Sequence, residues 1–111
     1  MTISFDDFLK VQIRKGTVIK AEPFPEAHKP ALKVWVDFGS ELGVKKTSAQ
    51  ITRHYDITSL IGKPVAGCVN LGARQIGPFL SEFLLLGFDD GKGAISLIAP
   101  DHNVPNGKVL S

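Results

Sequence analysis

Apolar and polar positions alternate most regularly over residues 31–38, where Leu32, Val34, Val36 and Phe38 fall on one face. This period of two predicts a strand with one face in the core. Residues 39–43 begin and end with glycine and predict a hairpin-like connection, and residues 44–52 predict the returning strand. The centre of the chain is therefore expected to be an antiparallel hairpin.

Shorter apolar runs predict further strands. Residues 12–21 are rich in β-branched side chains, with Gly16 as a bulge or bend, and the three prolines of residues 22–30 predict a stiff, irregular loop. We expect strands at residues 65–71, 81–88 and 94–99, the last two paired as a central hairpin, and an edge strand at Val109–Leu110 in the same sheet or a partner's. Residues 72–78 predict a surface loop that carries Arg74, because Gly and Pro are frequent there.

Helix is expected in only two places. Ser4 and Asp7 resemble a capping box ahead of Phe5, Phe8 and Leu9, which share one helical face, and residues 53–60 form a short helical or looped linker. Five to seven short strands between regular turn signals favour a small barrel or sandwich. The length suits a single domain spanning residues 1–111.

The composition is that of a soluble globular protein, and no apolar run of 18 residues is present, so we expect no membrane insertion. The N-terminal residues include Asp6 and Asp7 where a signal peptide needs basic residues, so a cytoplasmic location is expected. Cys68 lacks a partner for an internal disulfide and is expected to be a small buried side chain.

Charge changes this picture, because the net charge of +2 conceals a concentrated basic segment. Residues 45–74 contain five Lys or Arg residues against Asp56 alone, whereas residues 1–44 are balanced and residues 75–111 are acidic. A locally basic surface suits a polyanion such as nucleic acid. The alternative is a solvated charged face without a partner.

Catalytic, metal and cofactor chemistry find little support. The three histidines have no helical or strand spacing to one another or to Cys68, so no zinc ligand pair forms. Ser48 and Ser81 lack a nucleophile context, and the glycines match no phosphate-binding loop. We expect no catalytic residue, no metal and no cofactor. Trp35 and Tyr55 are open to two roles, stacking on unpaired bases or packing, with the N-terminal helix or a second subunit as possible partners for Trp35.

Several segments together resemble the tRNA-binding domain family. They are Lys46-Thr47-Ser48-Ala49-Gln50-Ile51, Tyr55, Leu60-Ile61-Gly62-Lys63, Val69-Asn70-Leu71, Ser81-Glu82 and Leu84-Leu85-Leu86-Gly87. Within that family the chain resembles the stand-alone CsaA type, an export-related chaperone, through Phe5-Asp6-Asp7-Phe8, residues 13–17, 31–33 and 36–39, and Val104-Pro105-Asn106-Gly107.

The resemblance implies an oligonucleotide-binding (OB) fold barrel, all-β, with a short N-terminal helix and a C-terminal extension. It also implies a homodimer, tRNA as one partner, and unfolded or precursor polypeptides held in an apolar groove as another. The residues expected to meet tRNA phosphates, riboses or base edges are Lys33, Lys45, Lys46, Ser48, Gln50, Arg53, Asn70, Arg74 and Ser81.

The chain departs from the family pattern at two positions. Related chains often carry a second arginine where Gln75 stands and a lysine where Leu80 stands. The loss of two positive charges is expected to weaken tRNA binding and flatten its salt dependence. Phe79 and Leu80 instead favour peptide binding if they are exposed, the alternative being that Leu80 packs into the barrel's rim.

These observations support a non-catalytic tRNA-binding protein that acts as an export-related chaperone. The alternative is an interaction module that docks on a synthetase or another protein without contacting RNA.

Overall fold

The structure is a computed structural model that describes all residues, 1–111. Strands dominate, as the alternation predicted, and the helices are single short turns. In chain order the elements are α1 (Phe5–Leu9), β1 (Ile13–Pro23), β2 (Leu32–Asp37), α2 (Gly39–Leu42), β3 (Val44–Ala49), α3 (Ile57–Leu60), β4 (Pro64–Cys68), β5 (Arg74–Ile76), β6 (Phe79–Ser81), β7 (Leu84–Leu85), β8 (Gly87–Asp89) and β9 (Ile95–Leu97).

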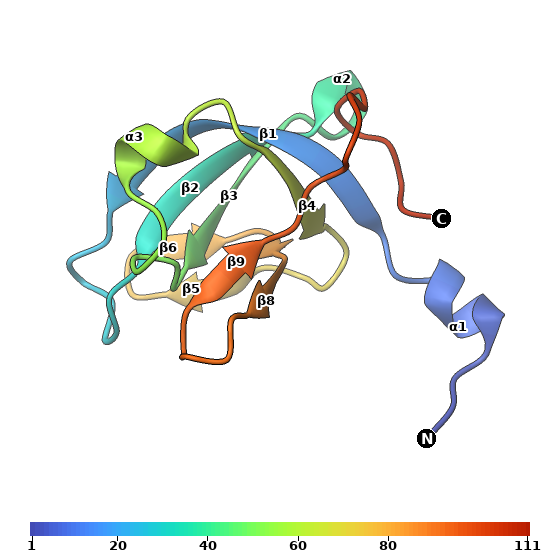
Figure 1. Cartoon of the computed structure of the whole chain (residues 1–111), viewed down its shortest axis with the longest axis horizontal. Helices are drawn as coiled ribbons and strands as arrows, with labels where there is room; N and C mark the ends of the chain where they lie inside the picture. The colour runs from blue at the N-terminus through green and yellow to red at the C-terminus, as the bar shows by residue number, and fades with distance from the viewer.

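Five strands form a nearly closed barrel in the order β3-β2-β1-β4-β7, with every neighbouring pair antiparallel. Figure 1 shows β1 to β4 curving around the core. The expected OB-type barrel with a short N-terminal helix is therefore confirmed. Its core contains the alternating face of β2, since Val34, Val36 and Phe38 are fully buried. Cys68 is buried as expected.

Gly16 has a different role from the expected bulge. The irregularity in β1 lies between Val18 and Lys20, where the pairing with β2 shifts register. Gly16 is buried, and a Cβ there would lie 2.4 Å from Val36 Cγ1, so glycine is required by close packing across the barrel.

Two further expectations are wrong. Residues 72–78 are not a loop, because β5 pairs with β6 in a hairpin that turns at Gly77 and Pro78. The segments at 81–88 and 94–99 do pair as a hairpin, through β8 and β9, but they are not central: β7 lies at the edge of the barrel sheet, and β8 and β9 form a separate two-stranded sheet. The prediction failed because apolar content does not reveal where a strand ends.

The two ends of the chain lie on the same side of the barrel (Figure 1). Ser4 Oγ accepts a hydrogen bond from the Asp7 N–H at 3.0 Å, which is one half of the expected capping box, yet α1 buries none of its residues. The tail at 107–110 runs beside β1 through backbone hydrogen bonds to Ile13 and Lys15 and one isolated bridge between Arg14 and Val109, so it takes the place of the expected edge strand without forming a full strand. No helix has the length and apolar character needed to span a membrane.

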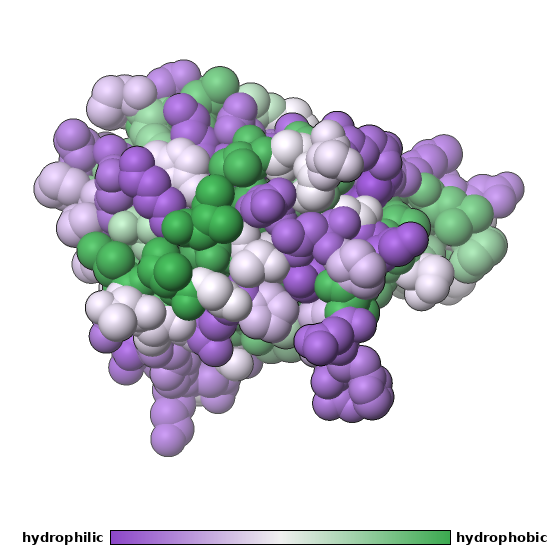
Figure 2. Space-filling model, turned by 90° about the horizontal axis from the view of Figure 1, so that it is seen from above, coloured by the Kyte–Doolittle hydropathy of each residue, from purple (hydrophilic) through white to green (hydrophobic).

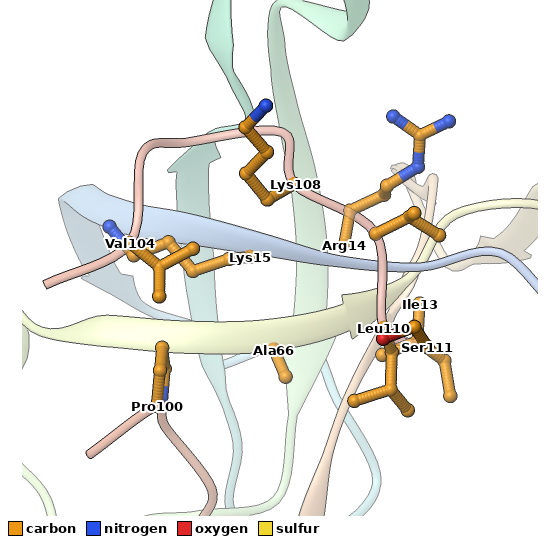
Figure 3. Close-up of a pocket in the computed structure, with 10 residues that line it drawn as sticks. Ile13, Arg14, Lys15, Ala66, Pro100, Val104, Lys108, Leu110 and Ser111 are labelled. Carbon is orange, nitrogen blue, oxygen red and sulfur yellow. The ribbon is translucent and has the colours of Figure 1, made fainter. Parts of the chain in front are cut away.

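A pocket of about 260 Å³ lies between β1, β4 and this tail (Figure 3). Figure 3 shows Arg14 and Lys108 extending to one side, while Ile13, Ala66 and Leu110 lie on the other. The tail therefore contributes both apolar and basic side chains to the side of the barrel from which α1 projects.

Candidate nucleic-acid interface

The outer face of β1, β2 and β3 carries a row of lysines. Strand pairing sets Lys20 opposite Trp35, Trp35 opposite Lys46, and Lys33 opposite Ser48. Opposed residues in an antiparallel pair point to the same face, so these side chains all lie opposite the core. Lys45 pairs with Val36 and so belongs to the other face of β3. The structure thus brings Lys33, Lys46 and Ser48 together and separates Lys45 from them.

Beneath these lysines is a second apolar cluster formed by Phe24, Ala31 and Phe79. The ring centroids of Phe24 and Phe79 are 5.4 Å apart, and Trp35 meets Phe79 edge to face at 6.0 Å. Trp35 therefore packs against Phe79, not against the N-terminal helix. Both phenylalanines are almost fully buried, although they lie outside the barrel.

The lysines lie close to the faces of these rings. Lys33 Nζ is 5.0 Å from the Phe24 centroid and 5.4 Å from the Phe79 centroid, and Lys46 Nζ is 5.2 Å from the Phe79 centroid. Ammonium groups at such distances are attracted to the ring quadrupole. Neither Lys33 nor Lys46 has an acidic partner, whereas Lys20 is paired with Glu22 at 3.2 Å. Two uncompensated charges are thus held on one surface.

A pocket adjoins this surface, between the loop at 24–31 and the β5–β6 hairpin. We call it the loop–hairpin pocket, and its volume is about 340 Å³. The lining residues are Ala27, His28, Lys29, Ala31, Ser48, Gln50, Arg74 and Ile76. It gathers three of the predicted RNA-binding residues, Ser48, Gln50 and Arg74, beside two that sequence reasoning missed, His28 and Lys29.

The missed residues had weak signals in the sequence. His28 and Lys29 lie in the proline-rich loop, which the sequence marked as stiff but not as part of a site. They come close to β3 and β5 only through the fold. The sequence did not indicate Lys20 as part of the basic face for another reason: residues 1–44 contain as many acidic as basic residues, so this part of the chain has no net charge.

Three predicted RNA-binding residues are engaged in internal hydrogen bonds. Asn70 accepts from the Gln12 N–H at 2.9 Å and donates to the Lys10 carbonyl at 2.6 Å, which fastens the start of β1 to the exit of β4. Arg53 donates to the Lys92 carbonyl at 2.8 Å. Both polar atoms of the Asn70 amide are thus engaged within the chain, and one guanidinium nitrogen of Arg53, Nη1, is as well, whereas the side chains of Ser48 and Gln50 make no internal hydrogen bond.

Ser81 is the third of these, and it lies on the open edge of β3. It is buried, and its Oγ lies 2.9 Å from Thr47 Oγ1 and accepts from the Ser48 N–H at 3.3 Å. The Glu82 N–H donates to the Lys46 carbonyl, and Glu82 Oε1 accepts from the Lys46 N–H. Residues 81 and 82 therefore satisfy the edge of β3 that no strand covers.

Tyr55, the other candidate for stacking on bases, is also engaged within the chain. Its hydroxyl accepts from the Leu97 N–H at 2.9 Å, and its ring packs against the barrel core. Of the two roles open to Tyr55, stacking on bases or packing within the protein, the structure shows packing.

The two residues predicted to bind peptide are separated by the pleat of β6. Phe79 is buried at 6% exposure under the lysines, while Leu80 is exposed at 38%. Leu80 pairs with Gln75, so the two positions where related chains often carry charge face one another on the hairpin. This exposed pair is neutral here.

An apolar surface larger than that of Leu80 alone lies at the gap between β3 and β7. This hollow, which we call the seam hollow, has a volume of about 360 Å³ and is lined by residues 48–51 and 84–87 and by Ile95. Leu84 is 51% exposed there. The gap exists because β3 and β7 do not pair, which leaves the barrel incompletely closed.

Away from these surfaces, one carboxylate has a strongly shifted pKa. His54 Nε2 lies 2.8 Å from Asp90 Oδ2, and the N–H groups of Lys92 and Ala94 donate to Asp90 Oδ1. The hydrogen bond from His54, followed by those two backbone bonds, lowers the pKa of Asp90 to about 2. No group of three His, Cys, Asp or Glu residues is arranged to hold a metal ion.

An OB-like barrel with basic and polar side chains on its outer face defines an oligonucleotide-binding type of domain. Residues 13–109 match the family model described as "Putative tRNA binding domain", so the chain belongs to that family. Methionine–tRNA ligase from Porphyromonas gingivalis is 37% identical over 105 residues, which are 95% of this chain and 15% of the ligase. The chain thus spans a small part of the length of the curated relatives it matches.

Two solved structures resemble the whole chain. The chaperone CsaA from Bacillus anthracis str. Ames has a TM-score of 0.93 and 41% identity, with 100% of both chains covered. The CsaA chaperone protein from Picrophilus torridus has a TM-score of 0.93 and 39% identity, covering 99% of this chain and 100% of its own. The predicted resemblance to this family and to the CsaA type is confirmed.

Proposed function

We propose that this protein is a non-catalytic tRNA-binding protein of the CsaA type that acts as a homodimeric, cytoplasmic, export-related chaperone without a cofactor. The observation that carries the RNA part is the outer face, where Lys33 and Lys46 have no acidic partner and adjoin the loop–hairpin pocket. Membership of the family supports the same part. Of the nine predicted RNA contacts, we retain Lys33, Lys46, Ser48, Gln50 and Arg74 as the central ones.

Phosphate neutralisation supplies most of the affinity in such a complex. Each lysine that meets a phosphate releases a condensed counterion, so binding is strongest at low salt. Ser48 and Gln50 have no charge to contribute and are placed to hydrogen-bond ribose or base edges. The neutral Gln75–Leu80 pair means that fewer phosphates are neutralised here than in related chains.

Filter binding of tRNA at low salt tests the RNA part. We expect the double variant Lys33→Ala, Lys46→Ala to bind tRNA about tenfold more weakly than the wild type. A matched control removes two charges that lie away from this face, Lys45→Ala and Lys92→Ala, and is expected to change the affinity less. Absence of tRNA binding by the wild type at low salt would refute the proposal.

The chaperone part is supported by the exposed apolar side chains and by the similarity to the CsaA chaperones. Leu80 and the seam hollow offer apolar contact to an unfolded segment, and the hollow is open because β3 and β7 do not pair. Phe79 is assigned a supporting role, since it is buried beneath the lysines.

Suppression of aggregation of a denatured client tests this part separately. The effect is expected to persist in salt that abolishes tRNA binding, because apolar contacts are not screened. Leu80→Ser combined with Leu84→Ser is expected to reduce it, whereas Phe88→Ser, which removes another exposed apolar side chain, serves as the control. Equal loss in both variants would contradict the assignment.

The homodimer is supported by the ends of the chain. Phe5 is 71% exposed on α1, and Figure 2 shows apolar side chains gathered on this projecting segment. The acidic residues Asp6 and Asp7 of α1 complement Arg14 and Lys108 at the tail pocket. A second copy would cover the exposed apolar residues and place two basic faces on one assembly.

The alternative function is an interaction module that docks on a synthetase without contacting RNA. Its support is the similarity to segments of methionine–tRNA ligases. A pull-down that yields one stoichiometric protein partner and no nucleic acid would favour it over the leading proposal.

A further inference from the structure

We propose that the loop–hairpin pocket holds a single unpaired nucleotide of the bound RNA. This inference rests on the proposed RNA-binding function and adds the class of RNA that the site selects. The supporting observation is that all five polar residues lining the pocket have side chains without a hydrogen bond or ion pair inside the chain. Elsewhere on the same surface, Ser81 is engaged internally.

The walls of the pocket match the three parts of a nucleotide. Ala27, Ala31 and Ile76 give an apolar wall for the face of a base. Ser48 and Gln50 give neutral donors and acceptors for a base edge, and Gln50 is exposed. Lys29 and Arg74 give cations for the flanking phosphates, with His28 beside them, and no acidic residue lines the pocket.

The two walls are held together before any ligand arrives. Phe24, in the loop, packs against Phe79, in the hairpin, at a centroid distance of 5.4 Å. Pro25 and Pro30 restrict the loop further, and the Ala27 N–H donates to the Phe24 carbonyl. A pocket whose walls are already fixed loses less conformational entropy on binding than a mobile loop does.

An unpaired nucleotide fits this position better than a paired one. Base edges in an RNA helix lie in a shallow or a narrow groove, while a splayed base exposes its face and its edges. Lys33 lies opposite Ser48 on the neighbouring strand, so a helix whose phosphates contact Lys33 and Lys46 can direct an adjoining unpaired nucleotide into the pocket.

Two RNA hairpins of the same stem sequence test the inference. One ends flush, and the other carries a single unpaired 3′ nucleotide. Wild-type protein is expected to bind the second about tenfold more tightly, the effect of one stacked and hydrogen-bonded base. The double variant His28→Ala, Gln50→Ala is expected to bind both hairpins equally, because both side chains are exposed and line the pocket.

A second variant separates this inference from the proposed function. Lys33→Ala with Lys46→Ala is expected to weaken binding of both hairpins by the same factor and to keep their ratio. If the wild type binds both equally well, the pocket inference is wrong while RNA binding stands. If it binds neither at low salt, both proposals are wrong. If the His28 and Gln50 variant folds, by circular dichroism, and keeps the tenfold preference, the pocket is not the site.

Discussion

Phe79 shows how a side chain's position can change its assigned role. The sequence suggested a peptide contact, but the ring lies beneath the ammonium groups of Lys33 and Lys46. Phe79→Leu is therefore expected to weaken tRNA binding severalfold, because the cation–π contacts to both ammonium groups are lost without any change of charge. Filter binding measures it, and Phe79→Trp is expected to restore the affinity. A leucine variant with unchanged affinity would show that the ring does not position the lysines.

Asp90 gives a prediction for pH. Because its pKa is lowered from 3.8 to about 2 in the folded chain, the folded state binds a proton less readily than the unfolded state. The resulting stabilisation is present above pH 4 and is lost as the pH falls toward 2. Asp90→Asn is expected to lower the urea midpoint at pH 7 and to have little effect at pH 2. An equal effect at both values would contradict the cause given.

At the residue scale, the sequence identifies which side chains could bind RNA, but not which of them are left free to do so by the fold. Ser48 and Ser81 are the same residue type, yet Ser48 lines both the loop–hairpin pocket and the seam hollow, while the Oγ of Ser81 bonds internally. The amide of Asn70 is of a type that binds RNA, but both of its polar atoms bond to the backbone of Lys10 and Gln12. Whether such a side chain bonds within the protein or stays free for RNA depends on residues more than 30 positions away along the chain. The local sequence therefore does not reveal it.

At the element scale, β1 crosses the barrel closely enough that one methyl group matters. Gly16→Ala would place a Cβ against Val36 and Phe38, which is expected to cost about 1–3 kcal/mol in the free energy of unfolding. Chemical denaturation measures this cost. Val36→Ala removes the clashing Cγ1, so this change is expected to cost less in the Gly16→Ala background than in the wild type. Additive costs would mean that another contact is responsible.

Long alternating strands were predicted well and short ones poorly. β2 has one buried and one outward face over its whole length, which sequence periodicity detects directly. β5 and β6 have three residues each and are defined by pairing across Gly77 and Pro78, two residue types that in a sequence predict a loop. Strands of this length carry too few positions for a period to show.

At the scale of the whole molecule, the exposed apolar α1 predicts the oligomeric state. Sedimentation of the wild type is expected to show a dimer, and Phe5→Ser with Leu9→Ser is expected to yield a monomer, because both side chains are exposed on α1. Phe88→Ser removes a side chain of equal exposure on the β8–β9 hairpin and is expected to leave the dimer intact. A wild-type monomer would exclude this arrangement.

The whole molecule also brings its two proposed activities close together. Ser48 and Gln50 line both the loop–hairpin pocket and the seam hollow. RNA and an unfolded peptide would thus meet neighbouring parts of one surface. Only part of the basic segment at residues 45–74 contributes to the proposed RNA-binding face, since Lys45 and Arg53 do not join the face that Lys33 and Lys46 form.

The salt dependence of tRNA binding tests the central claim most directly, namely that this outer face neutralises phosphates. The slope of log affinity against log salt is to be measured for the wild type and for the triple variant Lys33→Ala, Lys46→Ala, Arg74→Ala. Each lost phosphate contact reduces the slope by about 0.7 to 0.9, so the loss of three contacts is predicted to decrease it by roughly two to three units. An unchanged slope and affinity in the triple variant would contradict the account.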